Sequence, residues 1–171
     1  MNTPNPIGSK WTTVIVTILV AVAAQVLLFN RLYLGGWCMP MVYITALICL
    51  PVVPRWAEIL LGAATGLLMD ICCSSAGVHL SACVLITWLR PLLLSRMVQE
   101  YERLTDSVTA SAIGTSQFVR LAVVLCLLHH LVVTGLDLWN VAEPVYMLVR
   151  WLLSSAASLA FVLIYGMIRT S

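Results

Sequence analysis

The chain has 171 residues, of which 61% are hydrophobic and only 9% are charged, and its mean hydropathy is +1.02. A soluble domain carries about 25% charged residues, so the composition excludes a water-facing globular fold and predicts an all-α integral membrane protein. The net charge of +2, without a basic cluster, argues against a nucleic-acid partner.

A transmembrane helix needs about 20 mostly apolar residues, and six segments reach or approach that length. The second segment is the shortest, because Pro40, Pro51 and Pro54 bracket its apolar core and residues 37–39 are needed to extend it. The fourth contains Pro91, which we expect to bend its end. Within a single membrane domain over residues 1–171, the predicted spans are 11–29, 37–53, 56–71, 79–94, 118–138 and 145–168.

The orientation follows from lysine and arginine, which are enriched in cytoplasmic loops. With the N-terminus in the cytoplasm, only Arg31 and Arg150 fall on the outer side, so we predict that both termini are cytoplasmic. The sizeable loop 95–117 then lies in the cytoplasm. We expect the first span to remain as a membrane helix, because its apolar run continues past the small residues Ala21 and Ala23. The basic residues on the inner side are Lys10, Arg55, Arg90, Arg96, Arg103, Arg120 and Arg169.

Motifs for chemistry are missing from the sequence. The six cysteines include no C-x-x-C pair, so neither a zinc site nor a redox site is predicted. No G-x-S-x-G, H-E-x-x-H or P-loop pattern occurs. We therefore predict a protein that is not an enzyme and that carries no cofactor, metal or catalytic residue.

Ionisable residues gather at the outer ends of the predicted spans. Asp70 ends the third span, His79 opens the fourth, Asp137 ends the fifth, and Arg150 lies shortly inside the sixth. Ionisable residues at such depth usually face the protein interior and pair with one another. We expect Asp70 or Asp137 to pair with Arg150 and His79 to act as a donor; the alternative is that each group is solvated at the headgroup level.

Small residues mark the hairpin between the third and fourth spans. Gly62, Gly66 and Asp70 follow one another at intervals of four, so they share one helix face. Gly77 permits a tight turn before His79. This pattern predicts a closely packed helical hairpin with a polar tip, which could stabilise the hairpin, bind a partner or hold a ligand.

Two histidines, His129 and His130, lie near the middle of the fifth predicted span, where an unpartnered polar group is costly. His130 shares a helix face with Asp137. We expect a hydrogen bond between helices, with a proton relay as the alternative. Ser154 and Ser158 form a small-residue face on the sixth span, which indicates helix packing.

Several stretches of the sequence resemble a known family. They are VLLFNRLYLGGWCMPMVYITALICLP, GLLMD, AGVHLSACVLITWLRP and LHHLV. Over about residues 25–140 the chain resembles the rod shape-determining membrane protein family MreD. The most specific part is the ordered set Gly66, Asp70, Gly77, His79, Ala82, Arg90 and Pro91.

The resemblance implies a non-enzymatic, multi-pass scaffold in the bacterial cytoplasmic (inner) membrane, acting in cell-shape determination and lateral peptidoglycan synthesis. The implied partner is an MreC-like bitopic protein, with an MreB-like filament, a RodA-like glycosyltransferase, a class B penicillin-binding transpeptidase and membrane lipids as further partners. The alternative is a substrate-binding membrane subunit of an ECF-type vitamin transporter, a six-helix fold to which the family is similar, with an outer pocket lined by Asp70, His79 and Asp137. Candidate structural or partner-binding residues are Gly62, Gly66, Asp70, Gly77, His79, Arg90, Pro91, His130, Asp137 and Arg150.

Overall fold

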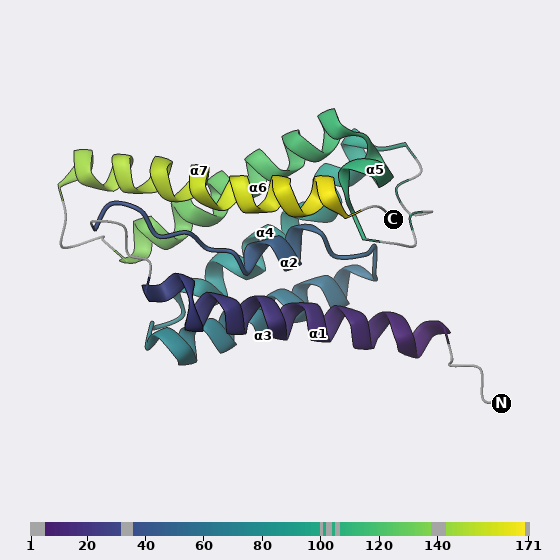
Figure 1. Cartoon of the computed structure of the whole chain (residues 1–171), viewed down its shortest axis with the longest axis horizontal. Coiled ribbons are helices and arrows are strands. Elements are labelled where there is room, and N and C mark those ends of the chain that lie inside the picture. The colour runs from purple at the N-terminus through teal and green to yellow at the C-terminus, as the bar shows by residue number, and fades with distance from the viewer. Residues whose placement is uncertain are drawn as a thin grey trace.

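The computed structural model describes residues 6–31, 36–99, 101, 104, 107–137 and 143–169 (Figure 1). Residue 138 of the fifth predicted span lies outside the described residues, as do residues 100, 102, 103, 105 and 106 of the predicted loop 95–117. The described chain is mainly helical. Its helices are α1 (Pro6–Leu27), η1 (Phe29–Arg31), α2 (Ile44–Ile48), α3 (Arg55–Cys73), α4 (Val78–Met97), α5 (Ala110–Ile113), α6 (Thr115–Asp137) and α7 (Pro144–Ile168).

Among the described residues, five helices are long and apolar enough to cross a membrane: α1 with its short extension, α3, α4, α6 and α7. Each of these helices begins before the first residue of the corresponding predicted span. Pro91 lies inside α4, which continues to Met97. The helix therefore extends past residue 94, where the fourth span was predicted to stop.

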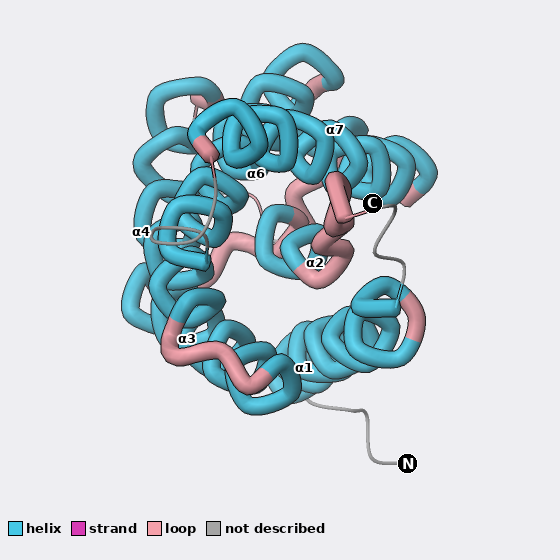
Figure 2. Tube along the Cα trace, turned by 90° about the vertical axis from the view of Figure 1, so that its left-hand side faces the viewer, coloured by secondary structure: helices cyan, strands magenta, loops and turns pink. Residues whose placement is uncertain are grey.

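The long helices surround α2 (Figure 2). Consecutive neighbours pack against one another: α1 on α3, α3 on α4, α4 on α6, and α6 on α7. Every residue of α2 is buried. The start of α1 and the end of α7 lie at the same end of the bundle (Figure 1). The short helix α2 occupies the centre of the bundle (Figure 2).

Residues 37–53 do not form the single helix that we predicted. Only Ile44–Ile48 is helical, because Pro40 lacks a backbone N–H and Pro51 and Pro54 disfavour helix at and before their positions. We call residues 36–53 the interior segment. Its chain runs alongside α7, since the hydroxyls of Ser154 and Ser158 accept hydrogen bonds from the backbone N–H groups of Met39 (3.0 Å) and Met41 (2.7 Å).

The α1 residue Gln25 satisfies the same stretch from the opposite side. Its side-chain Nε2 donates to the Pro40 carbonyl at 3.0 Å, and its Oε1 accepts from the Val42 N–H at 2.6 Å. Irregular backbone at membrane depth is tolerated only where protein groups replace the missing hydrogen bonds. The Gln25 side chain thus makes hydrogen bonds to backbone groups that are not bonded within a helix here.

The predicted small-residue face on α3 packs directly against α4. A Cβ atom placed at Gly66 would lie 2.5 Å from the Leu80 Cα and 2.7 Å from the His79 carbonyl oxygen, and one at Gly62 would lie 2.9 Å from the Cys83 carbonyl oxygen. Because these three neighbours are backbone atoms, they cannot move aside as a side chain can. The two helices approach this closely only because α3 carries glycine there.

We expect Gly66→Ala to lower the thermal unfolding midpoint in detergent, because overpacking a tight contact costs about 1–3 kcal/mol. The matched control is Gly135→Ala on α6, where an added Cβ meets nothing within 4 Å and where alanine is the better helix former by up to about 1 kcal/mol. Tryptophan fluorescence during heating measures both. Equal unfolding midpoints for the two variants would contradict a close backbone contact between α3 and α4 at Gly66.

Candidate functional site

The carboxylate of Asp70 binds the start of α4. It accepts hydrogen bonds from the backbone N–H groups of His79 (3.0 Å) and Leu80 (2.9 Å) and from the Ser75 hydroxyl (2.5 Å). The first N–H groups of a helix lack partners within the helix, and negative charge is favourable there. Asp70 therefore caps α4 from α3, which explains its proximity to His79 in the sequence.

The turn between the two helices uses the left-handed region of backbone conformation. Ser74 follows α3 as its C-cap with a φ of 55°, and Gly77 precedes α4 with a φ of 83°. Glycine adopts this region without steric cost. The predicted role of Gly77 in a tight turn is confirmed, and the turn brings the α4 amides onto the Asp70 carboxylate.

A buried tyrosine joins the interior segment to two helices. The Tyr43 hydroxyl lies 2.9 Å from His79 Nδ1 on α4 and 2.9 Å from His129 Nε2 on α6. Because a phenol has a single proton, Tyr43 can donate to one imidazole and accept from the other. The His79 side chain thus serves the interior segment, while its backbone N–H serves Asp70.

His130 connects α6 to α7. Its Nε2 lies 2.8 Å from the Ser158 hydroxyl, the same hydroxyl that accepts from the Met41 N–H. The expected hydrogen bond between helices is present. His130 and Asp137 share a face, but seven residues of helix separate them by about 10 Å along the axis, and Asp137 pairs with Arg150 instead.

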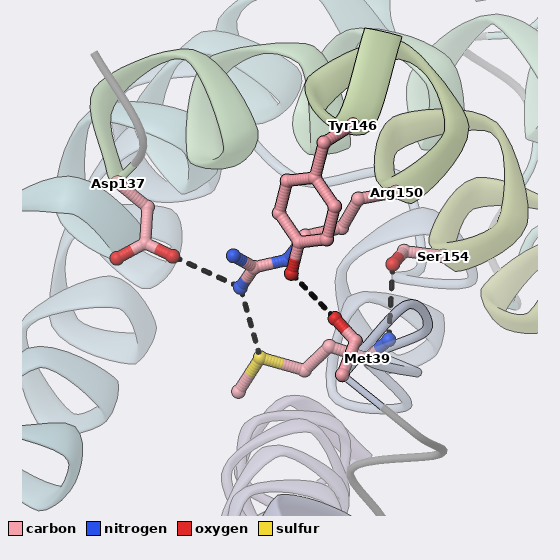
Figure 3. A network of polar contacts seen from close by, with 6 residues as sticks. Met39, Asp137, Tyr146, Arg150 and Ser154 are labelled. Atoms are coloured by element: carbon pink, nitrogen blue, oxygen red, sulfur yellow. Dashed lines mark hydrogen bonds and ion pairs between the residues drawn. The ribbon is translucent and has the colours of Figure 1, made fainter. Parts of the chain in front are cut away.

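Arg150 pairs with Asp137, one of the two partners that we predicted. Its Nη2 lies 2.9 Å from Asp137 Oδ2 and 3.9 Å from the Met39 sulfur, and Figure 3 shows the guanidinium between these two groups. The Arg150 side chain is 9% exposed and that of Asp137 is 48% exposed. Beside them, the Tyr146 hydroxyl donates to the Gly36 carbonyl at 2.6 Å. Side chains at the start of α7 thus hold the first residues of the interior segment.

A second ion pair secures the other end of the interior segment. Arg90 Nη1 lies 2.5 Å from Glu58 Oε1, and both side chains are almost fully buried. Its Nε donates to the Ile48 carbonyl at 2.9 Å, and its Nη2 donates to the Leu50 carbonyl. Arg90 was predicted as one of the inner-side basic residues; here its planar fork binds the carbonyls that follow α2.

Neither Tyr43 nor Glu58 was predicted from the sequence as a functional residue. Glu58 could have been, because a carboxylate within an apolar span usually pairs with a basic residue. Tyr43 carried no such signal, since a tyrosine in an apolar run resembles ordinary core. Both have their roles through contacts with residues far away in the sequence: Glu58 with Arg90, and Tyr43 with His129.

The arrangement is suited to holding a fold. In the part of the chain that the structure describes, no group of three or more His, Cys, Asp or Glu side chains is placed to bind a metal ion. Asp70 and His79, predicted at the outer pocket of the transporter alternative, are each about 95% buried and bind the chain's own groups. The candidate residues therefore converge on the interior segment and on the α3–α4 turn.

Comparison of the chain with protein families, curated proteins and solved structures gives no match.

We expect Asp70→Ala to loosen the first turn of α4, since losing a capping side chain costs about 0.5–2 kcal/mol. Hydrogen exchange at the amides of His79 and Leu80 should accelerate, and the thermal midpoint should fall. The control is Ser81→Ala, which removes only a hydroxyl that bonds to carbonyls of its own turn on an exposed face. Unchanged exchange in Asp70→Ala would contradict the capping role.

Proposed function

We propose that this protein is a non-enzymatic, MreD-like scaffold subunit of the bacterial cell-wall elongation machinery, acting in the cytoplasmic membrane beside an MreC-like bitopic partner. One observation supports the proposal most: the residues that carry the MreD resemblance make contacts within the chain itself. Gly66, Asp70, Gly77, His79 and Arg90 all stabilise the chain's own fold. They build a rigid body, and they leave helix surfaces and short loops to make contacts with other proteins.

The transporter alternative requires polar groups that converge on an open pocket. Polar side chains inside this bundle, among them Gln25, Tyr43, His130 and Ser158, are instead bonded to the interior segment or to one another. A vitamin would have to displace these bonds, and each buried polar group left unsatisfied costs about 1–3 kcal/mol. This balance favours the scaffold.

The proposal includes six membrane crossings. The interior segment starts beside Tyr146 near the beginning of α7 and passes Ser154 and Ser158 in turn. It reaches the C-terminal half of α4 at Arg90, so it runs along the bundle in the direction of α7. We assign it as a crossing made of extended chain and one short helix, which gives both termini the cytoplasmic side that the basic residues favour.

The number of crossings has a direct test, because an even number returns the chain to its starting side. A fluorescent protein that folds only in the cytoplasm, fused after Ser171 or before Met1, should be bright at both termini. Alkaline phosphatase, which is active only after export, should be inactive at both. One bright and one dark terminus would show an odd number of crossings and would refute the sixth one.

The scaffold role predicts which proteins accompany the chain. Gentle solubilisation of native membranes, affinity purification of the tagged full chain and mass spectrometry should recover an MreC-like bitopic protein with wall-synthesis enzymes. Expression of the chain in a rod-shaped bacterium depleted of its own MreD should restore rod shape. Recovery of a transporter ATPase, with no wall-synthesis protein, would contradict the proposal.

A matched pair of variants separates folding from function in that experiment. Gly66→Ala should reduce partner recovery in proportion to the loss of folded protein, whereas Gly135→Ala should leave both unchanged. Folded Gly135→Ala protein without any partner, alongside wild-type protein with one, would place the contact on the α6 surface near Gly135.

A further inference from the structure

A groove opens on the side of the bundle between the interior segment and α7. Its volume is about 630 Å³, within the range of about 300–1,000 Å³ typical of sites for small molecules. We call it the lateral groove. Its residues are Val42 and Thr45 of the interior segment, and Phe161, Ile164, Tyr165, Ile168 and Arg169 at the end of α7.

The walls of the lateral groove are hydrophobic and face outward. Ile164 and Ile168 are 57% and 75% exposed, which places them on the side of the bundle that meets lipid. Phe161 is fixed from behind by an edge-to-face contact with Phe29, with ring centroids 5.0 Å apart. The surface is therefore an apolar channel with one rigid aromatic wall.

One end of the lateral groove carries a positive charge. The Arg169 guanidinium lies 5.6 Å from the centre of the Tyr165 ring, and its Nη1 donates to the Tyr165 hydroxyl. No carboxylate forms an ion pair with Arg169 among the residues that the structure describes. The stacked arginine presents its remaining N–H groups at the point where α7 ends.

We propose that the lateral groove binds an anionic glycerophospholipid of the cytoplasmic leaflet, with an acyl chain along the apolar wall and the phosphate on Arg169. Guanidinium groups match phosphate geometry, and anionic lipids concentrate at basic residues on the cytoplasmic face. The inference rests on the cytoplasmic position of the α7 end and does not depend on the scaffold role.

The shape of the wall favours a lipid over a partner helix. Helices in membranes pack closely through small residues, as α3 and α4 do at Gly62 and Gly66. The lateral groove instead presents Phe161, Ile164 and Ile168, whose bulk keeps a second helix away. A flexible acyl chain can follow such a wall.

Binding there has a consequence for the centre of the bundle. Val42 and Thr45 belong to the interior segment, Thr45 within α2, so a lipid in the lateral groove contacts this segment directly. Thr45 is 94% buried, and its hydroxyl has no hydrogen-bond partner. A bound lipid therefore covers the side of the interior segment that Val42 and Thr45 present to the lateral groove.

Native mass spectrometry of the full chain, with phosphatidylglycerol or phosphatidylcholine of identical acyl chains added to the detergent, tests the proposal. Wild-type protein should retain phosphatidylglycerol in preference. Arg169→Gln should lose about fivefold of that preference, the contribution of one basic residue near an anionic surface. The matched control is Arg96→Gln, an exposed arginine in the last turn of α4, which should keep the preference.

A second pair of variants tests the position of the acyl chain. Thr45→Leu adds bulk to the wall without losing a hydrogen bond and should reduce retention of both lipids, whereas Thr45→Val, of equal size, should bind as the wild type does. Equal retention of the two lipids by wild-type protein, equal losses in the two arginine variants, or unchanged retention in Thr45→Leu would each overturn the proposal. So would a stable dimer or a partner helix cross-linked at Ile164.

Discussion

The structure depends on satisfying an unwound stretch of backbone inside a bundle of membrane-type helices. Most of residues 40–50 are buried inside the bundle, and only α2 within the interior segment makes regular helical hydrogen bonds. Each of the surrounding helices α1, α4 and α7 supplies a side chain for this purpose: Gln25, Arg90 and the serines Ser154 and Ser158. An unsatisfied group would cost several kcal/mol in such surroundings.

This requirement ties the bundle together across long distances in the sequence. In a membrane, apolar side chains gain little by leaving lipid for protein, so packing and polar contacts hold helices together. Here the polar contacts meet at the interior segment, which bonds to α6 and α4 through Tyr43 and to α7 through Met39 and Met41. Loss of the segment would remove the polar contacts that α1, α4, α6 and α7 make with the centre of the bundle.

The hairpin of α3 and α4 provides the rigid frame for this centre. Gly62 and Gly66 let the two helices touch at the backbone, and Asp70 fixes where α4 begins. Arg90 lies on this same helix α4, and its side chain donates to the carbonyls of Ile48 and Leu50. Such rigidity agrees with the proposed scaffold role, because contact surfaces on a rigid body keep one shape when a partner binds.

The membrane-helix character, the approximate positions of the long helices and the packed glycine face could be predicted from the amino-acid sequence, and Asp137 was one of two acids expected to pair with Arg150. These properties follow from local periodicity and from charges near helix ends. Three features became visible only in the folded chain: residues 37–53 are mostly not helical, Arg90 is buried and binds backbone carbonyls, and Tyr43 links two histidines. Met41 and its partner Ser158 are 117 positions apart, and whether a proline-bracketed stretch stays helical depends on distant side chains that no local pattern reveals.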